Sequence, residues 1–134
     1  MPTQTILIVE DNILNMELAT DVLEHVGYAV RQAATAEMGI AEALRLPPDL
    51  ILMDVALPGM DGVTATRQLK QHPQTRSIPI VFLTSHAMRG DQDRALAAGG
   101  ALYLTKPLDT RTLAGTLEAV LTGWENTIGQ EKTP

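Results

Sequence analysis

Carboxylate, hydroxyl and amine side chains follow four short apolar runs of this sequence, at the point where each run ends. Glu10 and Asp11 follow the first run, and Asp54, Thr84 and Lys106 follow the other three. Carboxylates this close together raise one another's pKa unless a cation compensates. All-oxygen ligands favour a hard ion, and Mg²⁺ prefers one or two carboxylates together with waters and phosphate oxygens. The set predicts a divalent-cation site, provided that the fold brings these residues together.

The apolar runs themselves have the pattern of strands that are covered on both faces of a parallel sheet. Each is continuously apolar rather than alternating. A weaker fifth run lies between the first two. The five runs are Ile6–Val9, Tyr28–Val30, Leu50–Met53, Ile80–Leu83 and Ala101–Leu104. In an open sheet of this kind, ligands bind beyond the carboxyl ends of the strands, which is where the reactive side chains stand.

The intervals between the runs are long enough for crossover helices. In the first interval, apolar residues recur every four positions and stop at Gly27, which indicates the end of a helix. Asp61 and Asp109 are candidate caps for the third and last helices, and Asp11 could cap the first. The alternation of strand and helix predicts an open parallel sheet with helices on both faces. The first repeat is Leu14, Leu18, Val22 and Val26; the other helices are expected over 36–46, 62–71 and 89–98 and along the stripe Leu113, Leu117, Val120 and Leu121.

Length and composition exclude several classes of protein. The chain has 134 residues and a formal net charge of −6, which suits one domain and argues against nucleic acid as a direct partner. It has no cysteine, which excludes disulfides, thiol catalysis and cysteine–zinc sites. No stretch is long and apolar enough for membrane insertion, and no leader precedes the first run, so we expect a cytoplasmic protein. We expect a domain over residues 1–122, a polar tail over 123–134 and no output domain.

Four motifs of the chain resemble those of response-regulator receiver domains, in order and in spacing, over residues 5 to about 122. The resemblance implies a (βα)5 doubly wound, five-stranded parallel sheet of strand order 2-1-3-4-5, the flavodoxin-like fold of chemotaxis receivers. Each motif alone is weak, and the combination is specific. The motifs are Val9-Glu10-Asp11-Asn12, Asp54 with Leu57-Pro58-Gly59-Met60-Asp61-Gly62, Leu83-Thr84-Ser85, and Tyr103-Leu104-Thr105-Lys106-Pro107.

The resemblance also implies roles for the acidic positions. Asp54 is expected to be the phosphoacceptor. Asp11 and Asp54 would ligate Mg²⁺ with their carboxylates, Ala56 would do so with its main-chain carbonyl, and Glu10 would act mostly through water. A carboxylate can serve as a nucleophile, and phosphoryl transfer depends on positioning and charge neutralisation.

Further roles fall on the last two strands. By the same resemblance, Thr84 and Lys106 would each contact a phosphoryl oxygen, and the Lys106–Pro107 peptide bond would be cis. On phosphorylation, Thr84 would move toward the phosphoryl group and Tyr103 would turn inward. The face formed by the fourth helix, fifth strand and fifth helix would then change its affinity for partners.

The expected partners follow from this switch. The phosphoryl donor would be a sensor histidine kinase or a histidine phosphotransfer protein, and the output would pass to an unknown downstream protein target. A homodimer through the fourth helix, fifth strand and fifth helix is a further partner that the resemblance allows. The chain would assist its own phosphorylation and dephosphorylation without being a turnover enzyme.

The residues argue against several other functions. A phosphohydrolase with an aspartyl-phosphate would place a second aspartate two residues after Asp54, where Ala56 stands. A flavin or nucleotide site would need a glycine-rich loop after the first strand. Ser85 and His86 lack the Gly-x-Ser-x-Gly setting of a hydrolytic triad, and a solvated loop histidine is the simpler interpretation of His86. An unphosphorylated scaffold of the same fold remains open.

Overall fold

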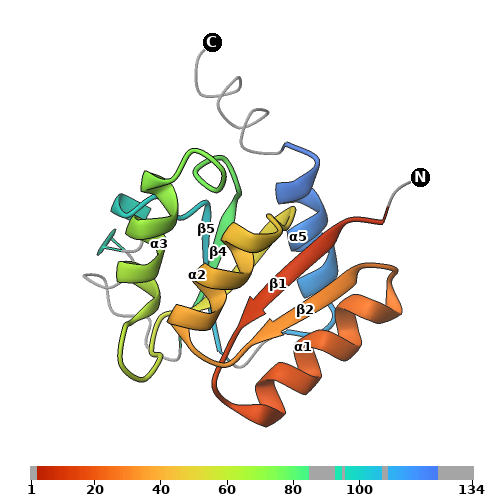
Figure 1. The fold of residues 1–134 in the computed structure, drawn as a ribbon. Helices are drawn as coiled ribbons and strands as arrows, with labels where there is room; N and C mark the ends of the chain where they lie inside the picture. Colours follow the sequence, from red (N-terminus) through yellow and green to blue (C-terminus); the bar gives the residue numbers. More distant parts are fainter. Residues whose placement is uncertain (1–2, 85–92, 95, 107–108, 124–134) are drawn as a thin grey trace.

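The computed structural model describes residues 3–84, 93–94, 96–106 and 109–123, which form a single parallel sheet between two layers of helices. The sheet has five strands in the order β2-β1-β3-β4-β5, and every neighbouring pair is parallel (Figure 1). The predicted doubly wound sheet and its strand order are therefore confirmed. The strands are β1 (Thr5–Val9), β2 (Ala29–Ala33), β3 (Leu50–Asp54), β4 (Ile80–Thr84) and β5 (Leu102–Thr105).

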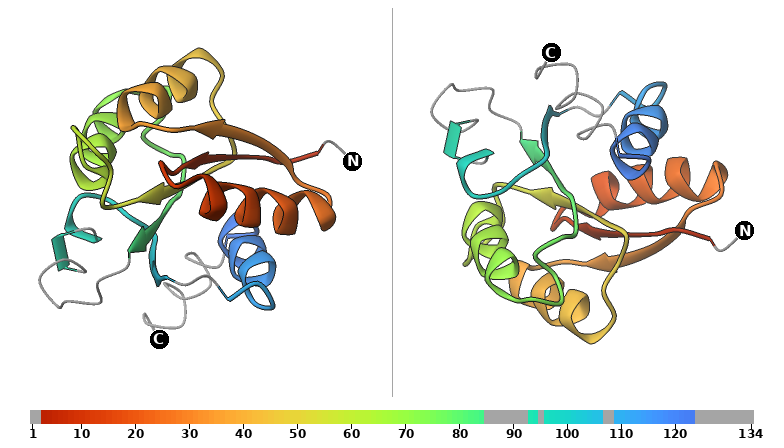
Figure 2. Two further views of the ribbon diagram at one scale, coloured as in Figure 1. Left: turned by 90° about the horizontal axis from the view of Figure 1, so that it is seen from below. Right: turned by 90° about the horizontal axis from the view of Figure 1, so that it is seen from above.

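Helices cover both faces of the sheet. Figure 2 shows α1 and α5 on one face and α2 and α3 on the other. Half of the helix expected over 89–98 lies outside the described residues, and residues 93–94 and 96–97 are helical. Residues 124–134 of the expected tail lie outside them too. The helices are α1 (Ile13–His25), α2 (Ala36–Arg45), α3 (Gly62–Gln71) and α5 (Leu113–Leu121). Within the described part of the chain, no helix could cross a lipid bilayer.

The three central strands are buried along almost their whole length because each packs against helices on both faces. Alternate residues of β1 enter different cores: Leu7 and Val9 pack with α2 and α3, and Ile6 and Ile8 pack with α1 and α5. The edge strands β2 and β5 are only partly buried. This pattern explains why the central runs are continuously apolar, and it holds the ends of β1, β3 and β4 rigidly beside one another.

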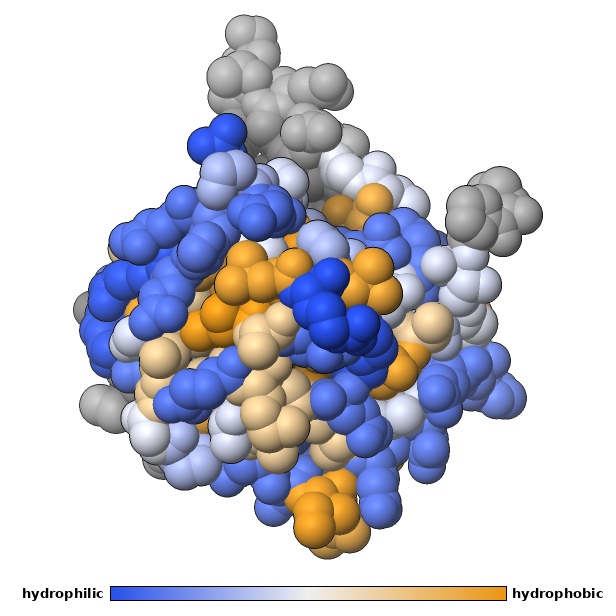
Figure 3. All heavy atoms as spheres, in the orientation of Figure 1, coloured by the Kyte–Doolittle hydropathy of each residue, from blue (hydrophilic) through white to orange (hydrophobic). Residues whose placement is uncertain are grey.

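The residues that α1 buries differ from the four-residue apolar repeat that predicted the helix. Met16, Ala19 and Leu23 face the sheet, whereas Leu14 is 75% exposed and Val26 is 53% exposed. In Figure 3 a group of apolar atoms projects at the lower edge of the molecule, where α1 begins. The helix was predicted correctly, and the side that it buries could not be read from that repeat.

The helix caps confirm one prediction and correct two. Asp61 caps α3 by accepting a hydrogen bond from the main-chain N–H of Thr64 at 2.8 Å. The cap of α1 is Asn12 rather than Asp11, so the Asp11 carboxylate is not used for capping. Asp109 does not cap α5, because that helix begins only at Leu113, after a short turn.

Candidate functional site

The site lies at the carboxyl ends of the strands, where the sequence predicted it. Glu10 and Asp11 follow β1, Asp54 is the last residue of β3, and Thr84 is the last residue of β4. Lys106 follows β5, and its main-chain N–H donates to the carbonyl of Thr84. Parallel strands in one register therefore bring all five predicted side-chain positions to one edge of the sheet.

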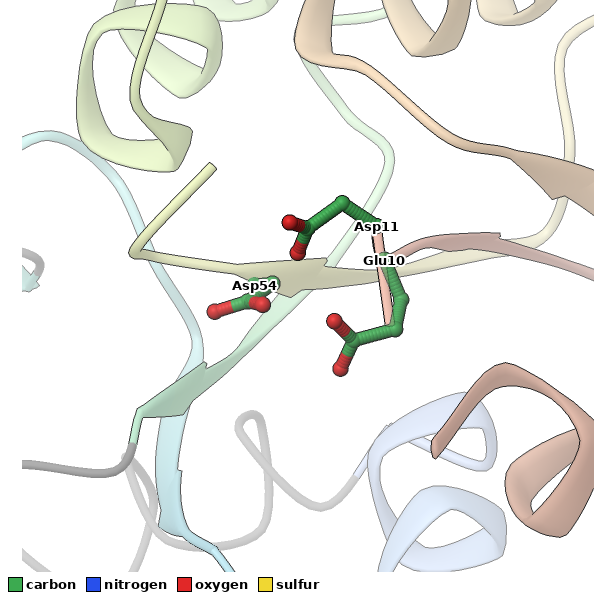
Figure 4. Close-up of side chains that lie close together, drawn as sticks. All are labelled: Glu10, Asp11 and Asp54. Carbon is green, nitrogen blue, oxygen red and sulfur yellow. The ribbon is translucent and has the colours of Figure 1, made fainter. Parts of the chain in front are cut away.

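The three acidic side chains point toward a common space (Figure 4). One carboxylate oxygen from each of Glu10, Asp11 and Asp54 lies within 4.8 Å of the others. Glu10 and Asp54 are each only 2% exposed, whereas Asp11 is exposed. The cluster thus has two buried carboxylates at its base and one at its mouth, and solvent reaches it from the side of Asp11.

The ammonium group of Lys106 lies against the two buried carboxylates. Its Nζ is 2.7 Å from Oε1 of Glu10 and 2.9 Å from Oδ2 of Asp54. Burial alone would lower the pKa of Lys106, but the carboxylates of Glu10 and Asp54 outweigh it and raise that pKa. Burial, together with the Asp54 carboxylate, raises the pKa of Glu10 against the opposing effect of Lys106. Lys106 therefore compensates only part of the negative charge.

Main-chain groups fix the orientation of both buried carboxylates. The N–H of Ala56 donates to Oδ1 of Asp54 at 3.0 Å, and the N–H of Asn12 donates to Oε2 of Glu10 at 3.1 Å. A Cβ atom on Gly62 would lie 2.2 Å from the carbonyl oxygen of Asp54. Only glycine therefore lets the first turn of α3 approach the end of β3 so closely. This contact was not predicted, and the position of Gly62 directly after the cap Asp61 was the available signal in the sequence.

The donor set fits a magnesium ion. Three carboxylates against one ammonium group leave a formal charge of −2, and all the donor atoms are oxygens, as a hard cation requires. Oε1 of Glu10 is buried and, among the described residues, accepts no hydrogen bond of ordinary geometry despite its ionic contact with Lys106. Such an oxygen is available to a water molecule on a metal. Ala56 also lies at the site, through its main chain.

The positions predicted to switch lie on the two last strands. Thr84 is 2% exposed, and Tyr103 is half-buried and packs against the core on the α2 and α3 side. Tyr103 pairs with Phe82 across the β4–β5 ladder, two positions before Thr84 pairs with Thr105. The two side chains are thus held on neighbouring strands. Ser85, His86 and the Lys106–Pro107 peptide bond were also singled out, and they lie outside the described residues.

Comparison with known proteins decides the family. The family model of the response regulator receiver domain matches residues 6–118. The chain belongs to that family. The flavodoxin-like receiver fold expected from the motifs is therefore confirmed, as is the assignment to two-component signalling.

Similar receivers include stand-alone proteins. Protein PilH of Pseudomonas aeruginosa is 40% identical over 118 residues, which cover 88% of this chain and 98% of PilH. The polar-differentiation response regulator DivK of Brucella ovis is 36% identical over 119 residues, 89% of this chain and 97% of DivK. This receiver is therefore similar, over nearly its whole length, to response regulators that consist of little else.

A solved receiver domain supports the chemical character of the site. The receiver of a sensor histidine kinase from Pseudomonas aeruginosa PAO1 is 36% identical and superposes with a TM-score of 0.79, covering 92% of this chain and 98% of its own. That structure has a magnesium ion coordinated in its active-site cleft. The acidic cluster of the present receiver offers the kind of donors that such an ion takes.

Proposed function

We propose that this receiver accepts a phosphoryl group on Asp54 from a histidine kinase or a histidine phosphotransfer protein, and that Mg²⁺ supports the transfer. The main support for the proposal is the environment of the Asp54 carboxylate. Its carboxylate is buried, lies within 4.8 Å of two further carboxylates, and has the Lys106 ammonium group 2.9 Å from Oδ2. A structural aspartate would need neither the additional acids nor the buried lysine.

The reaction forms one bond and breaks another. A carboxylate oxygen of Asp54 attacks the phosphorus atom, and the P–N bond of the donor breaks, so that its electron pair returns to the imidazole, which takes a proton from solvent. Lys106 supplies positive charge beside the attacking carboxylate. When bound, Mg²⁺ would neutralise charge on the phosphoryl oxygens. The N–H of Ala56 orients Asp54 by holding its other oxygen.

We assign the remaining roles from the receiver motifs. Asp11 and Asp54 would hold the metal directly, the carbonyl of Ala56 would complete the protein ligands, and Glu10 would act through water. The hydroxyl of Thr84, at the end of β4, would contact a phosphoryl oxygen. Because these residues position and neutralise rather than turn over a substrate, the receiver assists its own phosphorylation and dephosphorylation and is a switch rather than an enzyme.

The test of the phosphoacceptor is a single substitution with a matched control. With a small phosphodonor and Mg²⁺, wild-type protein should gain the mass of one phosphoryl group, and Asp54→Asn should gain none. Asp61→Asn makes the same chemical change seven residues away, and asparagine still caps α3. That control should be modified as the wild type is. Equal incorporation by Asp54→Asn and wild type would refute the assignment, and a chelator should abolish incorporation in both active proteins.

The signal would leave the site through β4 and β5. Phosphorylation adds about one negative charge or less to a carboxylate, a local change that needs a bistable element to reach a distant face. We assign that element to Thr84 and Tyr103, whose strands are paired. The downstream partner, or a second copy of the receiver, would read the face formed by the segment before β5, β5 itself and α5.

Spectroscopy separates this switch from a purely local event. Beryllofluoride should shift amide signals along residues 84–108 and change the binding of a partner or the oligomeric state. Thr84→Ala should suppress these distant shifts while Asp54 remains open to phosphorylation. Perturbations confined to the residues around Asp11, Asp54 and Lys106 would contradict the switch and leave the phosphoacceptor assignment intact. A receiver of this kind would act in the cytoplasm, as one domain over residues 1–122.

A further inference from the structure

A pocket of about 410 Å³ lies at the amino ends of the strands, at the end of the sheet opposite to the acidic site. Four of the residues that line it each stand directly before a strand, and the last turn of α5 forms another side. Figure 1 shows the end of α5 near the start of β1. Pockets that bind small molecules have volumes of roughly 300–1,000 Å³, so this one has room for an aromatic ring. The four residues are Gln4, Asp49, Pro79 and Ala101.

The charge of this pocket has the opposite sign to that of the whole chain. Among the described residues that line it, Lys70 and Arg76 are positive and Asp49 is negative, a formal sum of +1 in a chain of net charge −6. The carboxylate of Asp49 already accepts a hydrogen bond from the N–H of Thr5 at 2.7 Å. Arg76 is exposed, and within the described part of the chain its guanidinium group has no hydrogen-bond or ion-pair partner. The pocket is therefore suited to an acidic group.

The end of α5 lies at this pocket. Gly123, which lines it, has a φ of +89°, and its N–H donates to the carbonyl of Val120 at 3.1 Å. A glycine with this conformation and this hydrogen bond ends many helices, and the residue after it frequently packs back against the end of the helix. In this sequence that residue is Trp124, the only tryptophan of the chain, and Glu125 follows it. The last turn of α5 offers Leu121, which lines the pocket and is only partly buried.

We propose that this pocket is the docking site of the segment that begins at Trp124. The indole ring of Trp124 would lie against Leu121, and the carboxylate of Glu125 would pair with Arg76. An indole ring buries a large apolar surface and also attracts a guanidinium group to its face. The acidic residue directly after it matches the positive charge of the pocket. The docked segment would hold the end of α5 against the starts of β4 and β5, and this inference does not depend on phosphoryl transfer.

Tryptophan fluorescence measures the docking in the full-length chain. Because Trp124 is the only tryptophan, its quenching by acrylamide reports on this segment alone. In the folded receiver the ring should be protected from acrylamide, and its emission should lie at shorter wavelength than in the unfolded chain. Arg76→Glu should lower the ratio of docked to free segment by up to about fivefold, the factor that an exposed ion pair contributes. Arg67→Glu makes the same change on an exposed part of α3 outside the pocket and should leave the quenching unchanged.

A charge swap tests the partner of Arg76. Glu125→Arg alone should free the ring as Arg76→Glu does, and the two substitutions together should restore its protection. Glu131→Arg makes the same chemical change further along the chain, and in combination with Arg76→Glu it should restore nothing. Equal restoration by Glu131→Arg and Glu125→Arg would show only a general attraction of charges and would overturn the proposed pairing.

Amide spectra locate the docked segment and separate it from other occupants. Trp124→Ala should shift the signals of Ser77 and Ala101, which line the pocket. The signal of Ala56, at the acidic site, should not move. Unchanged signals in the pocket, or a ring as accessible to acrylamide in the folded protein as in the unfolded chain, would overturn the inference. Protection that depends on protein concentration would also overturn it, because a second copy of the receiver would then supply the occupant.

Discussion

Lys106 and Lys70 lie at opposite ends of the sheet, and their described contacts are to different kinds of group. Lys106, at the carboxyl ends of the strands, contacts the carboxylates of Glu10 and Asp54. Lys70, in the last turn of α3, donates from Nζ to the main-chain carbonyls of Arg76 and Ile78 at 3.0 and 2.8 Å. The described contacts of Lys106 are thus to carboxylates, and those of Lys70 are to main-chain carbonyl groups.

The difference separates a chemical site from a structural contact. Carbonyl groups hold the Lys70 ammonium group and thereby tie the end of α3 to the segment that leads into β4. At the other end, the carboxylates outnumber the ammonium group, and a bound cation or the protonation of a carboxylate would relieve the excess charge. The contacts of Lys70 join two segments of the fold, whereas the uncompensated carboxylates around Lys106 leave a place for a ligand.

The largest effect should come from substituting the two lysines in parallel. Lys106→Met should slow phosphorylation of Asp54 by a small phosphodonor about 100-fold, the usual cost of one lost charge-stabilising donor. Lys70→Met should leave that rate unchanged and lower the free energy of unfolding by about 1–2 kcal/mol, because its hydrogen bonds come from a charged donor. Rates are followed by intact mass, and stabilities by denaturant titration. A comparable loss of phosphorylation rate in Lys70→Met would contradict the distinction between the two lysines.

A second pair of substitutions compares Asp11, at the carboxyl ends of the strands, with Asp49, at their amino ends. Asp11→Asn should weaken Mg²⁺ binding by at least about tenfold, since even groups that only support metal ligands are worth that much. It should also raise the stability of the metal-free protein, because it relieves repulsion among the carboxylates. Asp49→Asn should do neither, since an amide oxygen can still accept from the N–H of Thr5. Calorimetric titration decides, and equal affinities of Asp11→Asn and wild type would contradict the site.

The smallest effects concern the dependence of stability on pH. Glu10 and Glu42 should change the free energy of unfolding with opposite sign as pH rises. Burial and Asp54 raise the pKa of Glu10, so the folded protein binds more protons than the unfolded chain at pH values above 4.5. Glu10 therefore makes stability fall as pH rises through its raised pKa. Hydrogen bonding to Arg45, with the charges of Arg45 and Arg31, lowers the pKa of Glu42. Glu42 therefore contributes stability above pH 4.5 that is lost as pH falls through its lowered pKa.

Denaturant titrations across the acid range measure both slopes in the metal-free protein. Subtracting the curve of Glu10→Gln from that of the wild type should leave a difference that declines with rising pH. The same subtraction for Glu42→Gln should leave a difference that increases. The same sign in both cases would show that Glu10 is not held in an unfavourable charged state.

The sheet and its reactive edge could be predicted because both depend on local sequence signals. Strands covered on both faces must be continuously apolar, and in a parallel sheet their carboxyl ends meet at one edge, so the residues after the runs identify the site. Asp54, Thr84 and Lys106 were found in this way, and the structure brings them together.

Other features depend on packing that a local pattern does not contain. Leu14 and Leu18 recur with helical spacing, yet α1 buries Met16 and Leu23, because the neighbouring β-sheet and α5 decide which side faces the core. The start of α5 could not be read from Asp109, since a turn intervenes. The contact between Lys106 and Glu10 joins residues far apart in sequence, and it follows only from the register of the strands and the length of the glutamate.

The most direct test of the central claim is to locate the phosphoryl group itself. Borohydride reduces the acyl phosphate of an aspartate to homoserine, whose position peptide mass spectrometry identifies. After treatment of the wild-type receiver with a small phosphodonor and Mg²⁺, the account predicts homoserine at residue 54 alone. Homoserine at residue 11, 49 or 61, or phosphate gained without any homoserine, would contradict it.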